Sequence, residues 1–145
     1  MSVGKRSRRQ VQKVRNDVFK RDGFQCVATE TTFGLRCSTD LSVQHRVKRG
    51  MGSSSRYDAP NYLLAMCGLH NSMDASDAVF RTFSIRYGWS APRWVAEREL
   101  MSRVPVFYGY GWFLLDGLER FRIPERVALD LMGEIYGRAS FGAGS

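Results

Sequence analysis

The chain has 145 residues, of which 43% are hydrophobic and 25% are charged, and its formal net charge is +8. This length suits one domain, and the apolar share excludes a wholly disordered chain. No stretch approaches the roughly 20 continuous apolar residues that a membrane span needs, so we do not expect an integral membrane protein. The positive charge favours a polyanionic partner, with nucleic acid ahead of an anionic membrane surface.

Cysteine usage and the N-terminus both bear on the compartment. Three cysteines are an odd number, which suits a reducing cytoplasm better than a disulfide framework. The basic N-terminus, MSVGKRSRRQ, is not followed by the apolar core of a secretion signal. We therefore expect a cytoplasmic protein.

The N-terminal residues predict a basic arm followed by a short amphipathic helix. Val11, Val14 and Val18 recur at helical spacing between Ser7 and Arg21. The remaining faces carry basic residues that we expect to contact DNA phosphates: Arg8, Arg9, Lys13 and Arg15. The alternative for such a run of charge is a solvated helix face.

The central region predicts a strand, a loop, a second strand and a helix. Residues 41–45, LSVQH, form the first strand of a predicted hairpin, and residues 46–49 continue it. The glycine- and serine-rich GMGSSS follows as a loop. The segment YLLAM then precedes a single helix that begins between Cys67 and His70 and runs to Tyr87.

The C-terminal region predicts a hairpin and one more helix. Two apolar runs, 104–108 and 112–115, are joined by Gly-Tyr-Gly, which is typical of a hairpin. Pro124 and Glu125 suit the start of a helix. Its predicted apolar stripe comprises Val127, Leu131 and Ile135. We expect most aromatic residues of this half to belong to the core.

Both histidines of the chain, His45 and His70, lie in one segment with Asn61 between them. Fifteen residues separate His45 from Asn61, and eight separate Asn61 from His70. A histidine at the end of a strand can act as a base, and a histidine with oxygen ligands can hold a cation. This combination indicates metal-assisted chemistry on phosphate.

The arrangement resembles the HNH endonucleases, in particular the small HNH proteins of actinobacterial tailed phages. The resemblance rests on RDGFQC, QHRVKRGMG, PNYLLAMCGLHNSMDASDA, RYGW, VPVFY and GWFLLD in that order. It implies an α+β fold with a ββα-metal core. We divide the chain into a basic arm and helix (1–20), an HNH core (21–90), a C-terminal hairpin and helix packed on that core (91–136) and a flexible tail (137–145).

The resemblance also implies roles for individual residues. His45 would be the general base, Asn61 would fix the loop around it, and His70 would complete the catalytic set. One divalent ion would be held by His70, Asp74 and Gln44. Gln44 departs from the usual Asp or His, and an amide oxygen binds a hard cation more weakly than a carboxylate. Asn71 and Asp77 are alternative ligands for this ion.

The expected cofactor is Mg²⁺, with Mn²⁺, Ni²⁺ or Zn²⁺ as alternatives at the same site. Arg46, Lys48 and Arg49 follow the base and would hold backbone phosphates, a kind of contact that carries little sequence information. The cysteines form no CxxC pair. We therefore expect Cys26, Cys37 and Cys67 to be buried free thiols rather than ligands of a structural zinc ion. Cys67-x-x-His70 nevertheless has a permitted zinc-ligand spacing.

These inferences predict a metal-dependent endonuclease that hydrolyses DNA phosphodiester bonds. If the gene belongs to a phage, the protein would act in the host cytoplasm, as a mobile endonuclease or beside the terminase and portal during packaging. We expect no membrane partner. The alternative is a non-catalytic DNA-binding or packaging accessory that keeps the scaffold, and RNA as a substrate stays open.

Overall fold

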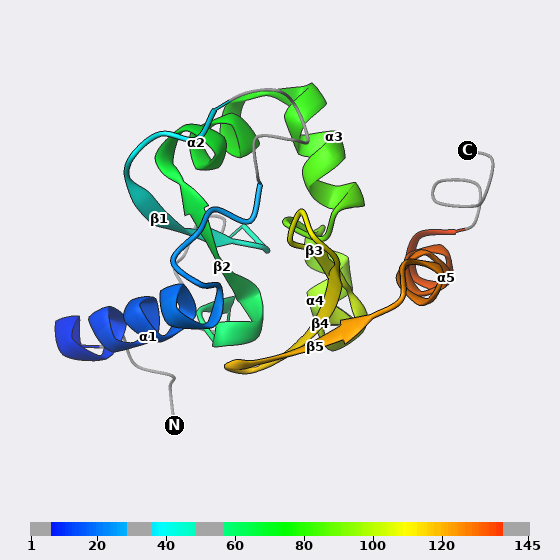
Figure 1. Ribbon diagram of the computed structural model, residues 1–145. Coiled ribbons are helices and arrows are strands. Elements are labelled where there is room, and N and C mark those ends of the chain that lie inside the picture. The colour runs from blue at the N-terminus through cyan, green and yellow to red at the C-terminus, as the bar shows by residue number, and fades with distance from the viewer. Residues whose placement is uncertain (1–6, 29–35, 49–56, 138–145) are drawn as a thin grey trace.

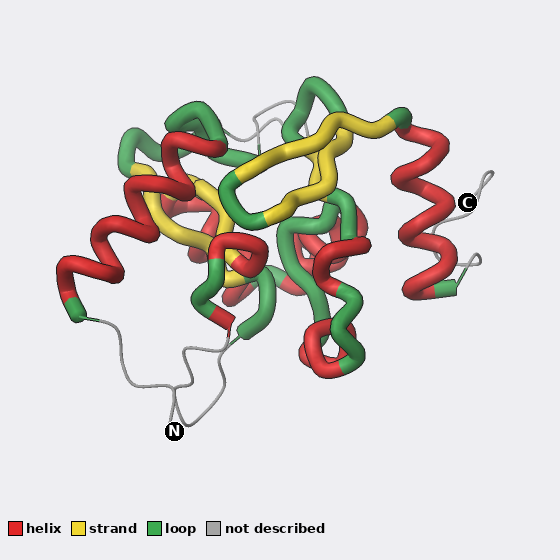
Figure 2. The backbone as a smooth tube through the Cα atoms, turned by 90° about the horizontal axis from the view of Figure 1, so that it is seen from below, coloured by secondary structure: helices red, strands yellow, loops and turns green. Residues whose placement is uncertain are grey.

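The computed structural model describes residues 7–28, 36–48 and 57–137, and these residues form a mixed α+β fold (Figure 1). The helices are α1 (Arg8–Arg21), α2 (Gly68–Ser76), α3 (Ala78–Arg86), α4 (Arg93–Glu97) and α5 (Glu125–Tyr136). The strands are β1 (Leu41–His45), β2 (Leu63–Cys67), β3 (Val106–Phe107), β4 (Trp112–Asp116) and β5 (Glu119–Ile123). They form two small antiparallel sheets, with the orders β1-β2 and β3-β4-β5. Helices α1 and α5 lie at opposite ends of the molecule (Figure 2).

Helix α1 has the predicted position. Ser7 caps it: the Ser7 hydroxyl accepts from the Gln10 backbone, and the Gln10 side chain accepts from the Ser7 backbone. Gly23, with φ of +70°, turns the chain away beyond the helix end. Val18 is fully buried whereas Val11 is 53% exposed, so the helix packs on the body mainly through its C-terminal half.

The predicted hairpin of β1 and β2 is present, and α2 follows β2 without a gap (Figure 1). The register pairs Leu41 with Cys67 and His45 with Leu63. The expected extension of β1 is wrong for residues 46–48, which are not in a strand. The Arg46 backbone N–H still bonds across the hairpin, to the Tyr62 carbonyl oxygen, before the chain bends away.

The single helix expected up to Tyr87 is two helices, α2 and α3. The backbone of Asp77 is extended, with φ of −116° and ψ of 114°. Its carboxylate accepts from the Phe80 N–H and caps α3. Gly88, with φ of +77°, lies beyond α3, where an added Cβ would clash with the Pro105 carbonyl oxygen. The capping preference of Asp77 therefore interrupts the helical pattern.

The C-terminal hairpin and helix are confirmed, with two differences. The sheet has a third strand, β5, whose sequence ERFRI is too polar to show a buried face. In α5 the buried residues are Ala128, Met132 and Gly133. The expected stripe is less enclosed, because Val127 is 37% exposed and Leu131 and Ile135 are half-buried, although Ile135 packs against the core.

Two apolar clusters form the core. The first packs both sheets against α3, and its members include Leu64, Met66, Phe80, Trp89, Tyr108 and Phe113. The second joins the α4 region to α5 through Val95, Met101, Trp112 and Met132. The half-buried Tyr87 packs against both clusters. Most C-terminal aromatics are core, as expected, although Tyr110 is 54% exposed.

No helix in the described part of the chain is long and apolar enough to cross a membrane. Four sequence predictions lie outside the described residues: the basic arm at residues 1–6, Arg49, the GMGSSS loop and the tail from residue 138.

Candidate metal centre and histidine pocket

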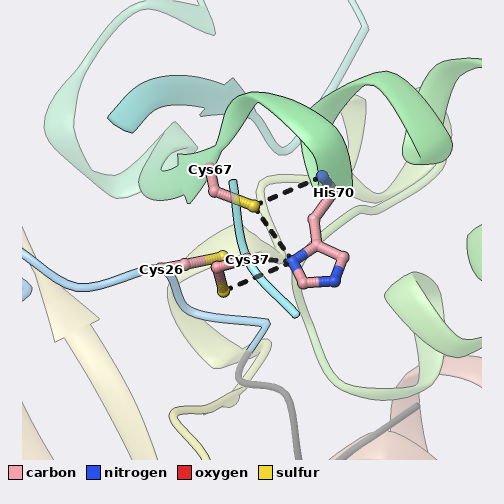
Figure 3. Close-up of side chains that lie close together, drawn as sticks. All are labelled: Cys26, Cys37, Cys67 and His70. Carbon is pink, nitrogen blue, oxygen red and sulfur yellow. Dashed lines mark hydrogen bonds between the residues drawn. The ribbon is translucent and has the colours of Figure 1, made fainter. Parts of the chain in front are cut away.

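The three cysteines and His70 converge on one point (Figure 3). Cys26 follows α1, Cys37 lies before β1, and Cys67 ends β2, so the cluster joins segments far apart in the sequence. The imidazole Nδ1 of His70 lies 3.5 Å from the Cys26 Sγ, 3.7 Å from the Cys37 Sγ and 3.2 Å from the Cys67 Sγ. All four ligand atoms lie within 4.8 Å of one another, and they could hold a metal ion.

Local structure places two of these ligands. Cys67 is the N-cap residue of α2, and its sulfur accepts from the His70 backbone N–H at 3.4 Å. His70 stacks on Phe80, with ring centroids 5.6 Å apart, so the Phe80 ring supports one face of the imidazole. The C-x-x-H spacing thus becomes one helical turn whose sulfur and imidazole nitrogen point to the same place.

The pKa shifts in this cluster have different signs. Burial raises the pKa of the Cys26 thiol and lowers that of the His70 imidazole, which keeps His70 neutral and able to coordinate. Burial also opposes ionisation of Cys67, but hydrogen bonds, first from the His70 backbone and then from Ser38, outweigh it and lower the pKa of that thiol. Cys67 is therefore better prepared than Cys26 to be a thiolate.

Our expectation of buried free thiols is met only in part: all three cysteines are free, but they lie close enough to His70 to hold a metal ion with it. Only Cys67 is buried, whereas Cys26 and Cys37 are half-buried, and all three sulfurs face His70. The spacing Cys67-x-x-His70 was the available signal. The sequence could not show that Cys26 and Cys37 complete the set, because the fold brings them together across gaps of ten and twenty-nine residues.

The predicted partners Gln44 and Asp74 do meet, in a network that is buried at Gln44, Asp74 and Ser90 and partly exposed at Lys48. The Gln44 Nε2 donates to Asp74 Oδ2 at 2.9 Å, and Ser90 Oγ donates to Asp74 Oδ1 at 2.9 Å. The Lys48 ammonium lies 2.5 Å from Asp74 Oδ2. Burial would raise the pKa of Asp74, but hydrogen bonds led by that from Lys48 outweigh it and lower the pKa.

These residues do not fit the predicted catalytic ion. The Asp74 carboxylate already has a cation in Lys48, and the His70 Nδ1 faces the sulfurs. Among the described residues, the buried Gln44 Oε1 has no hydrogen-bond partner. Asp77 caps α3 instead, and the half-buried Asn71 donates from its amide to Ser42 Oγ and to the Val43 carbonyl oxygen.

His45 lies apart from this network, at the end of β1. Its Nε2 is 3.2 Å from Asp58 Oδ1, and its side chain is 33% exposed. Both residues line a cavity of about 180 Å³ between α1 and the hairpin, with Arg15 as a further charged group. Sequence reasoning missed Asp58, because no spacing rule links it to His45 across the intervening loop.

Asn61 does not bond to His45 among the described contacts. Its side-chain oxygen accepts from the Gly117 N–H, and its backbone carbonyl accepts from Arg46 at 2.8 Å. Asn61 therefore ties the start of β2 to the β4–β5 turn and to the residue after His45. These contacts would fix the chain around His45 through Arg46, rather than through a hydrogen bond from Asn61 to His45 itself.

The predicted phosphate contacts divide by exposure. Arg46 is fully buried, which corrects its assignment as a phosphate contact, because a guanidinium enclosed by protein cannot reach DNA. Lys48 is partly exposed beside Asp74. The exposed residues of the predicted set are on α1: Arg8, Arg9, Lys13 and Arg15.

No family model matches the chain, and no curated protein or solved structure matches it either.

Proposed function

We propose that this chain is an HNH-type endonuclease that hydrolyses DNA phosphodiester bonds with His45 as the general base, and that the Cys₃His cluster binds a structural zinc ion. The observation that carries the catalytic part is the placement of His45. This imidazole is partly exposed, lies on a cavity, and shares that cavity with the Asp58 carboxylate and with Arg15 of α1. The order of hairpin and helix from β1 to α2 is that expected of a ββα-metal core.

Zinc is the metal that the ligand set and its dimensions favour. Three thiolates at about 2.3 Å and one imidazole nitrogen at about 2.0 Å from zinc give sulfur–nitrogen edges of about 3.5 Å in a tetrahedron. The three distances from the His70 Nδ1 are 3.2, 3.5 and 3.7 Å. Four protein ligands leave no open position, as in structural zinc sites. Zinc would fasten the residues after α1 and before β1 to the β2–α2 junction.

In the proposed reaction, His45 accepts a proton from a water molecule as that water attacks the phosphorus. A bond forms between the water oxygen and phosphorus, the bond from phosphorus to the leaving oxygen breaks, and the leaving oxygen takes a proton from solvent. Arg15 lies beside the base and would attract the phosphate. A divalent ion would neutralise the developing charge. We assign no ligands to it, because the predicted set does not fit.

The test is cleavage of supercoiled plasmid by purified protein with Mg²⁺, Mn²⁺, Ni²⁺ or Zn²⁺ added in turn. We expect nicked or linear products, and we expect His45→Ala to lower the rate by about 10²–10⁴-fold, the usual contribution of a general base. Thermal unfolding of the variant should match that of the wild type, since His45 lies outside both apolar clusters. Undiminished cleavage by His45→Ala would refute the assignment of the base.

A second function, DNA binding without cleavage, is favoured by the Lys48–Asp74 pair. Asp74 was expected to hold the catalytic ion, but its carboxylate is paired with the Lys48 ammonium. A scaffold that does not cleave DNA can keep this pair. Plasmid that is bound with a steep dependence on salt, yet stays intact with every ion of the panel, would favour this function over the first. Cleavage that depends on His45 would exclude it.

A further inference from the structure

Asp58 is an acidic residue that no motif assigns, and it lies against the proposed base. We propose that Asp58 is a positioning residue that fixes the orientation and the tautomer of the His45 imidazole. This inference rests on the proposed function, since it concerns the same base. The reaction of His45 is still proton abstraction from water, and the substrate is still a phosphodiester.

The contact itself decides which nitrogen is the base. The Asp58 Oδ1 lies 3.2 Å from the His45 Nε2. An ionised carboxylate only accepts hydrogen bonds, so the neutral imidazole must carry its proton on Nε2. The lone pair of Nδ1 is then the one that can take a proton from water. The pair therefore assigns base chemistry to Nδ1.

The exposed fractions of the two side chains agree with these roles, His45 as the base and Asp58 as its positioning residue. The His45 side chain is 33% exposed, whereas that of Asp58 is 13% exposed. The carboxylate is thus the less accessible of the two groups, and solvent reaches the imidazole more easily. A partner that held the base from the solvent side would block the attacking water instead.

Asp58 is attached to a well-fixed part of the chain. The preceding Tyr57 is 6% exposed, and its ring lies 5.5 Å from that of Tyr62, measured between centroids. Pro60 begins a short 3₁₀ helix two residues later, and that helix leads directly into β2. Since β2 pairs with β1, Asp58 and His45 are fixed by the same hairpin.

The surroundings of the pair suit a phosphodiester. The cavity of about 180 Å³ is lined by the apolar side chains of Val11, Val14 and Leu63. Besides His45 and Asp58, the charged residue Arg15 of α1 also lines it. The Arg15 guanidinium is held by a hydrogen bond of 3.3 Å to the Leu41 carbonyl oxygen. Arg15 can therefore attract a phosphate while Asp58, with opposite charge, holds the imidazole.

The kinetic test compares Asp58→Asn with the wild type and with Asp116→Asn, an exposed carboxylate on β4 that removes the same charge. We expect Asp58→Asn to lower kcat for plasmid cleavage by about 10–100-fold, a part of what a general base contributes, with KM nearly unchanged. Asp116→Asn should match the wild type. Unchanged kcat in Asp58→Asn, while His45→Ala abolishes cleavage, would refute the positioning role and leave the proposed function intact.

A second measurement does not depend on cleavage. Long-range ¹H–¹⁵N spectra of histidine-labelled protein show which ring nitrogen carries the proton, and the two histidines of the chain are distinguished by the His45→Ala variant. At a pH where the ring is neutral, we expect His45 to be protonated on Nε2 alone, and Asp58→Asn to give a mixture of tautomers. The same pattern in both proteins would refute the inference. If the wild type cuts no DNA, the proposed function fails, and with it the base that Asp58 would position.

Discussion

The Arg46 guanidinium donates to three backbone carbonyl oxygens, those of Gly88, Asn61 and Val104, at 2.8 to 3.1 Å. Burial lowers the pKa of Arg46 to about 10, so the side chain keeps its charge at neutral pH. Its acceptors belong to three separate segments of the chain. Arg46 therefore links these three segments from a buried position directly after the proposed base.

Replacement of Arg46 by lysine should destabilise the protein. A single ammonium cannot reach all three carbonyl oxygens that the planar guanidinium bridges. The carbonyl oxygens that lose their donor would then be buried without a hydrogen bond. We expect a loss of about 2–4 kcal/mol in the free energy of unfolding, measured by urea denaturation. The same change at the exposed Arg126 of α5 is the control and should be nearly neutral. Equal stability of both variants would contradict the role given to Arg46.

At the scale of single residues, the sequence identified types and spacings but not directions. His45 at a strand end and the Cys67-x-x-His70 turn were visible in it. The direction in which His70 points depends on Cys26 and Cys37, which only tertiary packing brings near. Arg46 was misassigned because a basic residue beside a predicted base looks the same in sequence whether it faces DNA or the core.

At the scale of elements, the Asp74 network joins three of them. Asp74 is on α2, Gln44 is on β1, and Ser90 follows α3. Lys48 adds its ammonium from the segment after β1. One buried carboxylate thus holds the helix against the hairpin and orients the strand that carries His45.

Loss of the Asp74 carboxylate should destabilise this junction strongly. In Asp74→Ala, Gln44 and Ser90 would lose buried hydrogen bonds and Lys48 its counter-charge, which we expect to cost about 3–5 kcal/mol in urea denaturation. The exposed Asp116→Ala is the matched control. A loss below about 1 kcal/mol would show that the network contributes little.

The same carboxylate predicts how stability depends on pH. The pKa of Asp74 is lowered in the folded protein, so its contribution is complete above the unfolded value of about 3.9 and is lost as pH falls through the folded value. Between neutral pH and strong acid, the wild type should therefore lose more stability than Asp74→Asn. Parallel curves for the two proteins, measured by urea midpoints, would contradict this prediction.

Element boundaries were predictable where periodicity and capping agreed. Helix α1, the β1–β2 hairpin and the start of α5 all combine an apolar pattern with a capping or turn residue. The break at Asp77 was missed because the apolar pattern continues through it, and β5 was missed because its side chains are mostly exposed. In both cases local hydrogen bonds, rather than burial, determine the structure.

For the whole molecule, the proposed function predicts that α1 forms part of the DNA-binding surface. The net charge is +8, α1 carries exposed basic residues, and one of them, Arg15, lines the cavity that contains His45. The arm before α1 adds further basic residues in the sequence. DNA that lies along α1 would bring a phosphate to the proposed base.

Removal of three charges from α1 should weaken DNA binding without sequence dependence. For Arg8→Gln, Arg9→Gln and Lys13→Gln combined, we expect the slope of log K against log salt to become shallower by about 2–3, close to 0.9 for each lost phosphate contact. The control replaces Arg81, Arg86 and Arg126, which lie on α3 and α5. An equal change in both triple variants would show that only net charge matters.

Under the proposed function, the two histidines have separate roles, His70 in a metal centre and His45 at the substrate. The most direct test is the zinc content of the purified wild-type protein and of its two histidine variants after an EDTA wash. We predict about one zinc per chain in the wild type and in His45→Ala, and a large loss in His70→Ala, because only His70 faces the three sulfurs. Equal zinc retention by both variants, or no zinc in the wild type, would contradict the account.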